Sequence, residues 1–115
     1  MFNDEPVFID PPLWGNHFWM SIESIILAMD TKEKNSVDSV YMFLMSLQNT
    51  LPCPTCRNHY QNYCSKYNLN NYIYNKKLMF QWIYRLQKEI QERNQKTMVD
   101  YPTYLENIKK KFQLD

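Results

Sequence analysis

A single glycine, Gly15, occurs among the 115 residues of this chain. Two-residue hairpin turns depend on residues that adopt positive φ, above all glycine, and phosphate-binding loops need several glycines. Both kinds of structure are therefore excluded. Since the alternation of apolar and polar residues that is typical of strands is also missing, we predict an all-α fold, a four-helix bundle with a short fifth helix.

Apolar residues recur at helical spacing in five segments. We expect Asp10 and the prolines after it to start the first helix and Ser36 to cap the second. The third should open at Cys53, the fourth should extend as a charged tail to about Lys96, and Asp100 should cap the fifth. The apolar positions that define the helices are Trp14, Phe18, Trp19, Ile22, Ile26, Met29, Val37, Val40, Tyr41, Leu44, Leu47, Tyr60, Tyr63, Tyr67, Met79, Trp82, Ile83, Leu86, Ile90, Tyr104, Ile108 and Phe112.

Residues 1–12 are expected to form an irregular lead-in and residues 13–115 one domain. The lead-in contains acids and prolines, without the basic start and apolar block of a signal peptide, and no run approaches the ~20 apolar residues of a membrane span. The formal net charge of +1 gives no reason to expect nucleic acid or an anionic membrane as a partner. Three cysteines are too few for a disulfide framework, so we expect the reducing cytoplasm, where a CxxC pair is more often catalytic or metal-binding than structural.

The cysteine pair Cys53 and Cys56 carries the main chemical signal of the sequence. Pro54, between the two, suits the first turn of a helix, because its missing N–H has no intrahelical partner there. We therefore expect the pair at a helix start, where unpaired N–H groups lower the pKa of a thiol. Arg57 and His59, close behind the pair, strengthen the interpretation of a reactive site.

Several interpretations of the cysteines remain open at this point. Cys53, Cys56, His59 and Cys64 have the ligand types of a zinc site, but one helix cannot close a tetrahedron around an ion. A thioredoxin-like site needs a βαβ context that the pattern lacks, and Cys64 by itself is expected to be a free, half-buried thiol. A redox pair inside a helical bundle needs an electron acceptor, and the aromatic content of 16% suits a flavin, which is flat and accepts two electrons. The alternative from another class is a non-enzymatic interaction module with a relic or zinc-binding pair.

Three segments are together more specific than the cysteine pair alone. In them the chain resembles the FAD-linked sulfhydryl oxidases of the Erv/ALR type, particularly the short single-domain forms encoded by large DNA viruses. The segments are Trp14-Gly15-Asn16-His17-Phe18-Trp19, then Leu51-Pro52-Cys53-Pro54-Thr55-Cys56-Arg57-Asn58-His59, and finally Trp82, Ile90, Lys96, Tyr101 and Tyr104 in that order.

The resemblance implies FAD as the cofactor and a reaction that converts two protein thiols and O2 into a disulfide and H2O2. It further implies that a substrate thiolate attacks Cys53 and that Cys56 hands the electrons to the flavin. Glu23 and Gln87-Lys88 stand where the family usually has histidine and His-Asn. The cofactor-binding residues that the resemblance implies are Trp14, Gly15, Trp19, Glu23, His59, Trp82, Lys88, Gln91, Lys96 and Tyr101.

The partners implied by the resemblance are a thiol-containing protein or a small redox relay protein, with O2 as the acceptor. A homodimer through the first two helices is also implied, with the host-cell cytoplasm or the virion as the location. No metal, nucleic acid or membrane span is expected.

Overall fold

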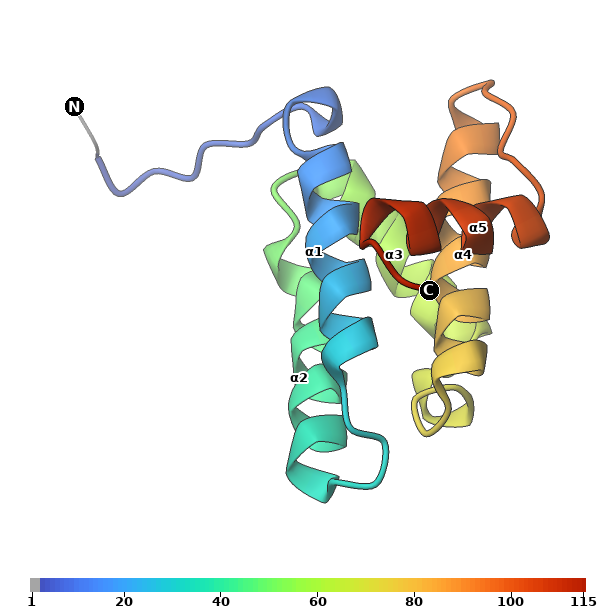
Figure 1. The fold of residues 1–115 in the computed structure, drawn as a ribbon. Helices are drawn as coiled ribbons and strands as arrows, with labels where there is room; N and C mark the ends of the chain where they lie inside the picture. Colours follow the sequence, from blue (N-terminus) through green and yellow to red (C-terminus); the bar gives the residue numbers. More distant parts are fainter. Residues whose placement is uncertain (1–2) are drawn as a thin grey trace.

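The structure is a computed structural model that describes residues 3–115, so the first two residues of the predicted lead-in lie outside it. The described chain contains five α-helices and no strand, which confirms the all-α prediction (Figure 1). The helix α2 packs on α3 and α1 packs on α4, while α5 lies crosswise over α1 and α4 (Figure 1). The helices are α1 (Gly15–Ala28), α2 (Lys34–Thr50), α3 (Pro54–Lys66), α4 (Lys76–Arg93) and α5 (Tyr101–Lys111), with short 3-10 turns η1 (Pro11–Leu13) and η2 (Leu69–Asn71).

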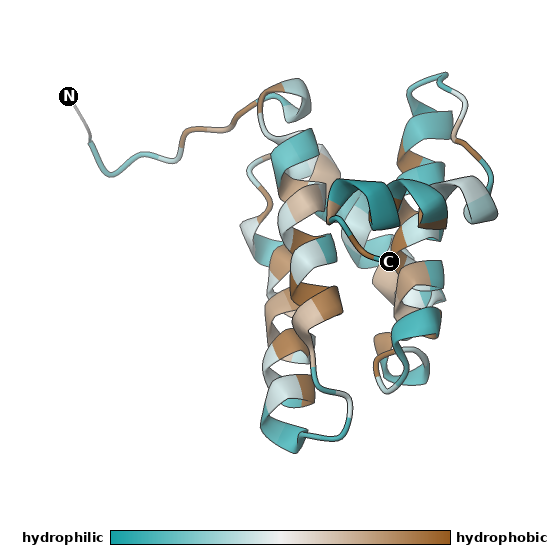
Figure 2. Ribbon diagram, in the orientation of Figure 1, coloured by the Kyte–Doolittle hydropathy of each residue, from teal (hydrophilic) through white to brown (hydrophobic). Residues whose placement is uncertain are grey.

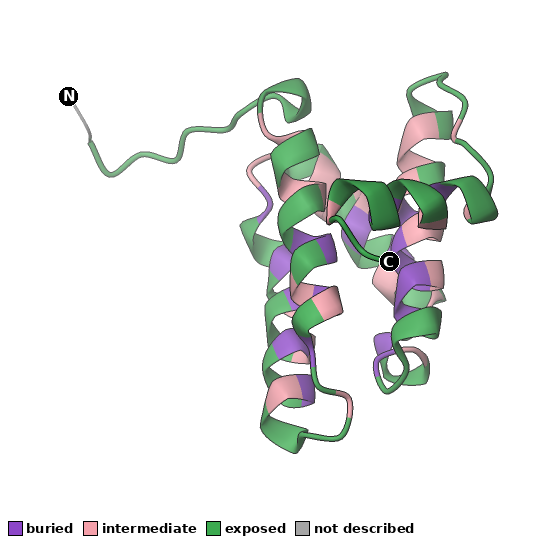
Figure 3. Cartoon of the chain, in the orientation of Figure 1, coloured by how far each residue is buried: buried purple, intermediate pink, exposed green. Residues whose placement is uncertain are grey.

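One core lies between the helices and collects apolar side chains from all five. Buried residues (Figure 3) and hydrophobic residues (Figure 2) coincide on the inner stripes of α1, α2 and α4. Each fully buried large apolar side chain contributes about 1.5–3 kcal/mol to folding. The buried members of the predicted helix faces are Ile22, Ile26, Met29, Val37, Val40, Leu44, Leu47, Tyr60, Tyr63, Met79, Trp82, Ile83, Leu86, Tyr104 and Ile108.

Aromatic side chains of α3 tie the bundle together through their polar ends. The hydroxyl of Tyr60 donates a 2.6 Å hydrogen bond to the carbonyl of Leu44 on α2. The hydroxyl of Tyr63 donates a 2.6 Å bond to the carbonyl of Trp82 on α4. Because both hydroxyls are buried and satisfied, the rings can lie in the core without the penalty for an unpaired polar group.

Two helix starts differ from the predictions. The helix α1 begins at Gly15, because the residues after Asp10 form a 3-10 turn and the Asp10 side chain makes no capping bond. The helix α2 is capped by Glu33, whose carboxylate accepts the N–H of Asn35 at 3.1 Å, so the predicted cap by Ser36 was wrong. The hydroxyl of Ser36 instead accepts the N–H of Asp30 at 3.0 Å and closes the turn between α1 and α2.

The end of α4 also differs from the prediction. The helix ends at Arg93, short of the expected Lys96, because Gln95 takes the left-handed conformation with φ 61°. The N–H groups of Gln95 and Lys96 then donate back to the carbonyls of Glu92 and Gln91 at 3.0 and 2.8 Å, which is the Schellman pattern of a helix end. The predicted cap by Asp100 on α5 is confirmed, since its carboxylate accepts the N–H of Thr103 at 2.9 Å.

Within residues 3–115, none of the helices combines the length and the apolar character that crossing a membrane would need.

Candidate active site

The cysteine pair lies where the loop after α2 turns into α3. Cys53 is the N-cap of α3, and its Sγ accepts a 3.3 Å hydrogen bond from the backbone N–H of Cys56. Pro54 occupies the first turn, as its missing N–H predicts. Both cysteines are half-buried free thiols, and both line the same pocket.

The backbone just before the pair is held from two sides. The Nε of Arg57 donates a 2.6 Å hydrogen bond to the carbonyl of Leu51, and the guanidinium lies 5.6 Å from the centroid of the Phe8 ring. The N–H of Ile9 donates to the carbonyl of Pro52 at 2.9 Å. The N-terminal segment and α3 therefore fix the approach to the first cysteine together.

A pocket of about 240 Å³ opens beside the two cysteines. Its aromatic wall comes from the start of α1, where Phe18 makes edge-to-face contacts with Trp14 and Trp19 at centroid distances of 5.4 and 5.5 Å. The indole Nε1 of Trp14 donates to the carbonyl of Ile9 at 2.9 Å, which fixes the orientation of the ring. The last turns of α4 also line the pocket. The pocket is thus lined mostly by aromatic and other apolar side chains, and both cysteines of the pair line it.

Polar groups enter this pocket from α3 and α4. His59 follows the cysteine pair, and Glu89 and Arg93 lie one turn apart on α4. The Nη1 of Arg93 lies 2.7 Å from the Nδ1 of His59, which links the two helices across the pocket. Burial, with a smaller effect from Arg93, holds the pKa of His59 below its ordinary value.

The predicted effect of the helix start on thiol acidity is wrong for Cys56. Burial raises the pKa of Cys56 to about 12, and the neighbouring Cys53 adds to the shift. The backbone N–H groups of the helix start and the charge of Arg93 act in the opposite direction, but they are outweighed. For the pKa of Cys56, the increase caused by burial is therefore larger than the decrease caused by the helix start.

Six of the sequence-predicted residues are brought together in the pocket. They comprise the cysteine pair, His59 and three residues at the start of α1. A methyl group added at Gly15 would meet no protein atom within 4 Å. The residues are Trp14, Gly15, Trp19, Cys53, Cys56 and His59.

The other predicted cofactor residues lie elsewhere. Trp82 is fully buried in the core, and its Nε1 donates to the carbonyl of Tyr67 at 3.0 Å. Lys88 and Tyr101 line a separate depression. Lys88 lies on the side of α4 away from the pocket residues Leu86 and Ile90, about 200° around the helix.

The last two predicted cofactor residues lie at the end of α4. Gln91 is half-buried and Lys96 is exposed, and the backbone bond between them closes the helix. Their cofactor roles, like those of Trp82, Lys88 and Tyr101, stay predictions.

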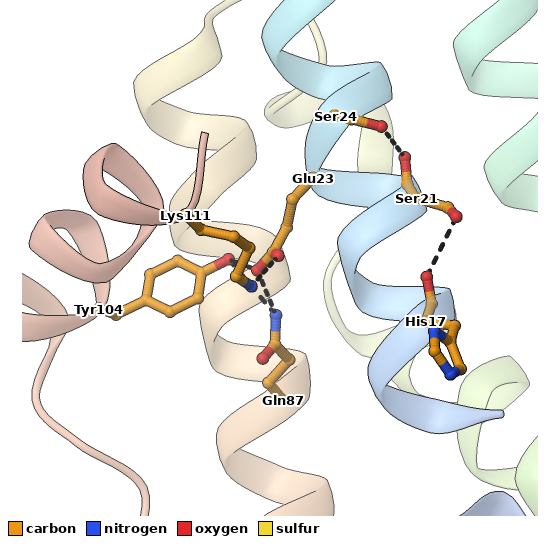
Figure 4. A network of polar contacts seen from close by, with 7 residues as sticks. All are labelled: His17, Ser21, Glu23, Ser24, Gln87, Tyr104 and Lys111. Atoms are coloured by element: carbon orange, nitrogen blue, oxygen red, sulfur yellow. Dashed lines mark hydrogen bonds and ion pairs between the residues drawn. The ribbon is translucent and has the colours of Figure 1, made fainter. Parts of the chain in front are cut away.

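Glu23 is the buried polar residue of α1, and Figure 4 shows it pointing toward α4 and α5. Its carboxylate accepts hydrogen bonds from the hydroxyl of Tyr104 at 2.7 Å and from the amide of Gln87 at 3.2 Å. The ammonium of Lys111 forms an ion pair with it at 2.7 Å. Two of the positions that depart from the family pattern, Glu23 and Gln87, are thus bonded to each other and to α5, and the predicted cofactor role of Glu23 stays untested.

Sequence reasoning did not single out Glu89, Arg93 and Asn94, which also line the pocket. A signal for the first two was present, because they continue the spacing of the apolar positions Leu86 and Ile90 on one face of α4. The link from Arg93 to His59 spans 34 positions of sequence and had no local signal.

The residues around this pocket fit a flavin ring. The ring is flat and apolar on its faces, and the aromatic wall of α1 offers surfaces of the same kind beside a sulfur pair. Ligand pockets commonly reach about 300–1,000 Å³, so the pocket suits one end of a dinucleotide, with the rest outside it. Within residues 3–115, His, Cys, Asp and Glu side chains form no group of three or more that could hold a metal ion.

A helical bundle with a CxxC pair in the lining of an aromatic pocket is typical of a redox protein of the dithiol class. Residues 16–113 match the Erv1 / Alr family, and the chain belongs to that family.

Two relatives are informative, and both carry names that place them among FAD-linked sulfhydryl oxidases. A protein of Invertebrate iridescent virus 3 is 23% identical over 105 residues, which cover 90% of this chain and 71% of the relative. A protein of Fowlpox virus (strain NVSL) is 34% identical over 71 residues, which cover 57% of this chain and 71% of the relative. No solved structure matches the chain.

Proposed function

We propose that this protein is an FAD-linked thiol oxidase that forms disulfides in protein substrates. The observation that carries the proposal is that Cys53 and Cys56 line the aromatic pocket, in a chain of the Erv1 / Alr family. Trp14, Trp19 and His59 would hold the flavin ring, and Gly15 would leave room for it.

In the proposed reaction the disulfide between Cys53 and Cys56 accepts two electrons from the substrate. A substrate thiolate attacks the sulfur of Cys53, the intramolecular S–S bond breaks, and Cys56 leaves as a thiolate. A second substrate thiolate then attacks the mixed disulfide, which releases the oxidised substrate and leaves both cysteines reduced. Bound FAD supplies the two-electron acceptor that restores the disulfide, with O2 as the final acceptor and H2O2 as the product.

The assignment of roles to the two sulfurs follows the position of each in α3. Cys53 is the N-cap, at the junction with the loop, and we assign it the attack by the substrate thiolate. Cys56 lies inside the first turn and is removed from water strongly enough to raise its pKa. Because burial disfavours the thiolate of Cys56, the proposed role requires a compensating partner, which the bound flavin ring and the charge of Arg93 would supply.

The oxidase proposal is tested by the spectrum and the oxygen consumption of the full-length protein. We expect a yellow protein that absorbs at about 450 nm and consumes O2 with a dithiol substrate while H2O2 accumulates. Cys53→Ser and Cys56→Ser should each abolish oxygen consumption and leave the yellow colour, because either loss breaks the route from substrate to flavin. Cys64→Ser is the matched control, since Cys64 does not line the pocket, and it should keep the activity.

A colourless protein after reconstitution with FAD, or full activity in either of the first two variants, contradicts the proposal. The first outcome would favour a non-enzymatic helical interaction module.

The proposal extends to assembly and location. Met20 on α1 and Met42 and Phe43 on α2 have exposed fractions of 46%, 70% and 39%, so both helices carry apolar side chains that a partner surface would remove from water. We propose a homodimer through these two helices.

We further propose that the substrate is a thiol-containing protein or a small redox relay protein. By analogy with the viral origin of the two relatives, the proposed location is the host-cell cytoplasm or the virion.

A further inference from the structure

The imidazole of His59 is held from one side by a residue of another helix. Arg93 lies in the last turn of α4, and its Nη1 is 2.7 Å from the Nδ1 of His59 on α3. Both residues line the pocket that contains the cysteine pair. The contact therefore determines which ring nitrogen of His59 remains free for a ligand or substrate in the pocket.

The chemistry of the guanidinium group decides the direction of this hydrogen bond. Arginine stays protonated at all relevant pH values and offers only donors. The Nδ1 of His59 must therefore be the acceptor, and the ring proton of the neutral imidazole must be on Nε2. Protonation of Nδ1 would place two donors against each other and two positive charges 2.7 Å apart.

The surroundings of the pair favour this arrangement. No carboxylate of the described residues lies within 4.0 Å of the guanidinium of Arg93, so no ion pair competes with His59 for it. Besides His59, the titratable and charged groups that line the pocket are Cys53 at the N-cap of α3, Cys56 and Tyr60 on α3, and Glu89 and Arg93 on α4. The part of α1 that lines the pocket adds only Gly15 and aromatic side chains.

We propose that Arg93 is a positioning residue that holds His59 as the neutral Nε2–H tautomer, so that His59 offers a hydrogen-bond donor to the pocket and does not act as a base. The lowered pKa of His59, caused first by burial and then by Arg93, agrees with this assignment. A neutral donor suits a carbonyl oxygen, a ring nitrogen or a thiolate in the pocket. The role in thiol oxidation rests on the proposed function, whereas the tautomer does not.

The tautomer can be measured by nuclear magnetic resonance of the histidine side-chain nitrogens in the full-length protein. The chain has two histidines, and the exposed His17 provides an internal reference. We expect the spectrum of His59 at pH 7 to show the Nε2–H tautomer, and its protonation to occur below the ordinary pKa of about 6.5.

Three variants separate positioning from general effects of charge. In Arg93→Met, His59 should become a mixture of tautomers, and its pKa should rise toward the ordinary value. Arg93→Lys keeps a donor-only cation and should preserve the tautomer. Lys77→Met removes an exposed charge from the same helix and should leave the His59 spectrum unchanged.

An Nδ1–H tautomer or a doubly protonated ring of His59 at pH 7 overturns the assignment. The same holds if Arg93→Met leaves the tautomer and the pKa as they are in the parent. The measurement also separates this proposal from the oxidase proposal. A colourless, inactive protein that shows the Nε2–H tautomer would support the role of Arg93 while contradicting the oxidase.

Discussion

The sulfur of Cys56 combines a reactive motif with a poorly hydrated position. Its pKa is raised to about 12, mainly by burial. Below the ordinary thiol pKa of about 8.5 the group is neutral in both the folded and the unfolded state. Between that value and about 12, the unfolded chain loses its proton while the folded protein keeps it, so this group disfavours the folded state increasingly as the pH rises.

This leads to a prediction for the reduced protein without flavin. The rate at which iodoacetamide modifies Cys56 should still increase with pH above about 10, whereas an ordinary thiol, with a pKa of about 8.5, reaches its plateau at about pH 10. Mass spectrometry of the peptide that contains Cys56 measures the rate over the pH series, with free cysteine as the reference. If the rate for Cys56 levels off at or below the pH at which the rate for free cysteine levels off, burial does not control the acidity of Cys56.

Among single residues, the sequence predicted pocket residues that lie close together in one short segment. The tryptophans around Gly15, the cysteine pair and His59 all line the pocket, whereas Arg57 does not. Arg93 was missed because its partner is 34 positions away, and helical spacing gives the face of a residue without its partner on another helix. The acidity of Cys56 was wrongly predicted for a related reason, since burial depends on neighbours from other helices.

At the scale of elements, the cross-helix α5 is fixed by the buried carboxylate of Glu23. Tyr104 and Lys111 of α5 both bind it, and Gln87 of α4 completes the set. Removal of one partner from a buried charge is costly, because the charge keeps its desolvation penalty. The Lys111 side chain is 38% exposed, which reduces the expected effect of its loss.

We therefore predict that Lys111→Met lowers the free energy of unfolding by about 1 kcal/mol. Lys110→Met, which removes an exposed lysine from the same turn, should change it by less than about 0.5 kcal/mol. Urea titration followed by circular dichroism measures both variants. Equal effects of the two substitutions would show that the ion pair does not stabilise α5.

The C-terminal end of α4 offers a second prediction at this scale. Gln95 has φ 61°, a conformation that costs a residue with a side chain about 1–2 kcal/mol and that glycine adopts freely. Gln95→Gly should relieve this strain. The greater entropy of glycine in the unfolded chain offsets part of the gain, so the net stabilisation should be up to about 1 kcal/mol.

Gln81→Gly, in the interior of the same helix, is the opposite control and should destabilise the protein by about 1 kcal/mol. Thermal unfolding of the two variants beside the parent measures the difference. A lower melting temperature for Gln95→Gly would show that the side chain of Gln95 contributes contacts that outweigh its backbone strain.

Helix faces and the cap of α5 could be predicted, because both depend on residues within one or two turns. The cap of α2 could not, since Glu33 and Ser36 are both able to accept N–H groups and the turn back to α1 engages Ser36. The end of α4 was missed because the usual signal, a glycine, is replaced by Gln95.

For the assembly of two copies, we expect the interface at α1 and α2, because these helices carry exposed apolar side chains. Met42→Glu places a charge on the most exposed of these side chains and should convert the proposed dimer to monomers, because a charge that loses its hydration in an interface is costly. Sedimentation equilibrium of the full-length protein measures the assembly.

Tyr74→Glu is the matched control, since Tyr74 is 66% exposed and lies between α3 and α4, away from these helices. It should leave the dimer unchanged. A parent protein that is monomeric at micromolar concentration, or a dimer that survives Met42→Glu, would contradict the assembly through α1 and α2.

Because the space around Gly15 is open, a substitution there can change ligand binding without destabilising the fold. A glycine in a helix costs about 0.5–1 kcal/mol relative to alanine, and at Gly15 a methyl group would meet no atom of the protein itself within 4 Å. Alanine at this position should thus leave the fold intact or make α1 more stable. Whatever that substitution takes away must come from a molecule that lies against the start of α1, so this position can report on the bound ligand independently of the stability of the bundle.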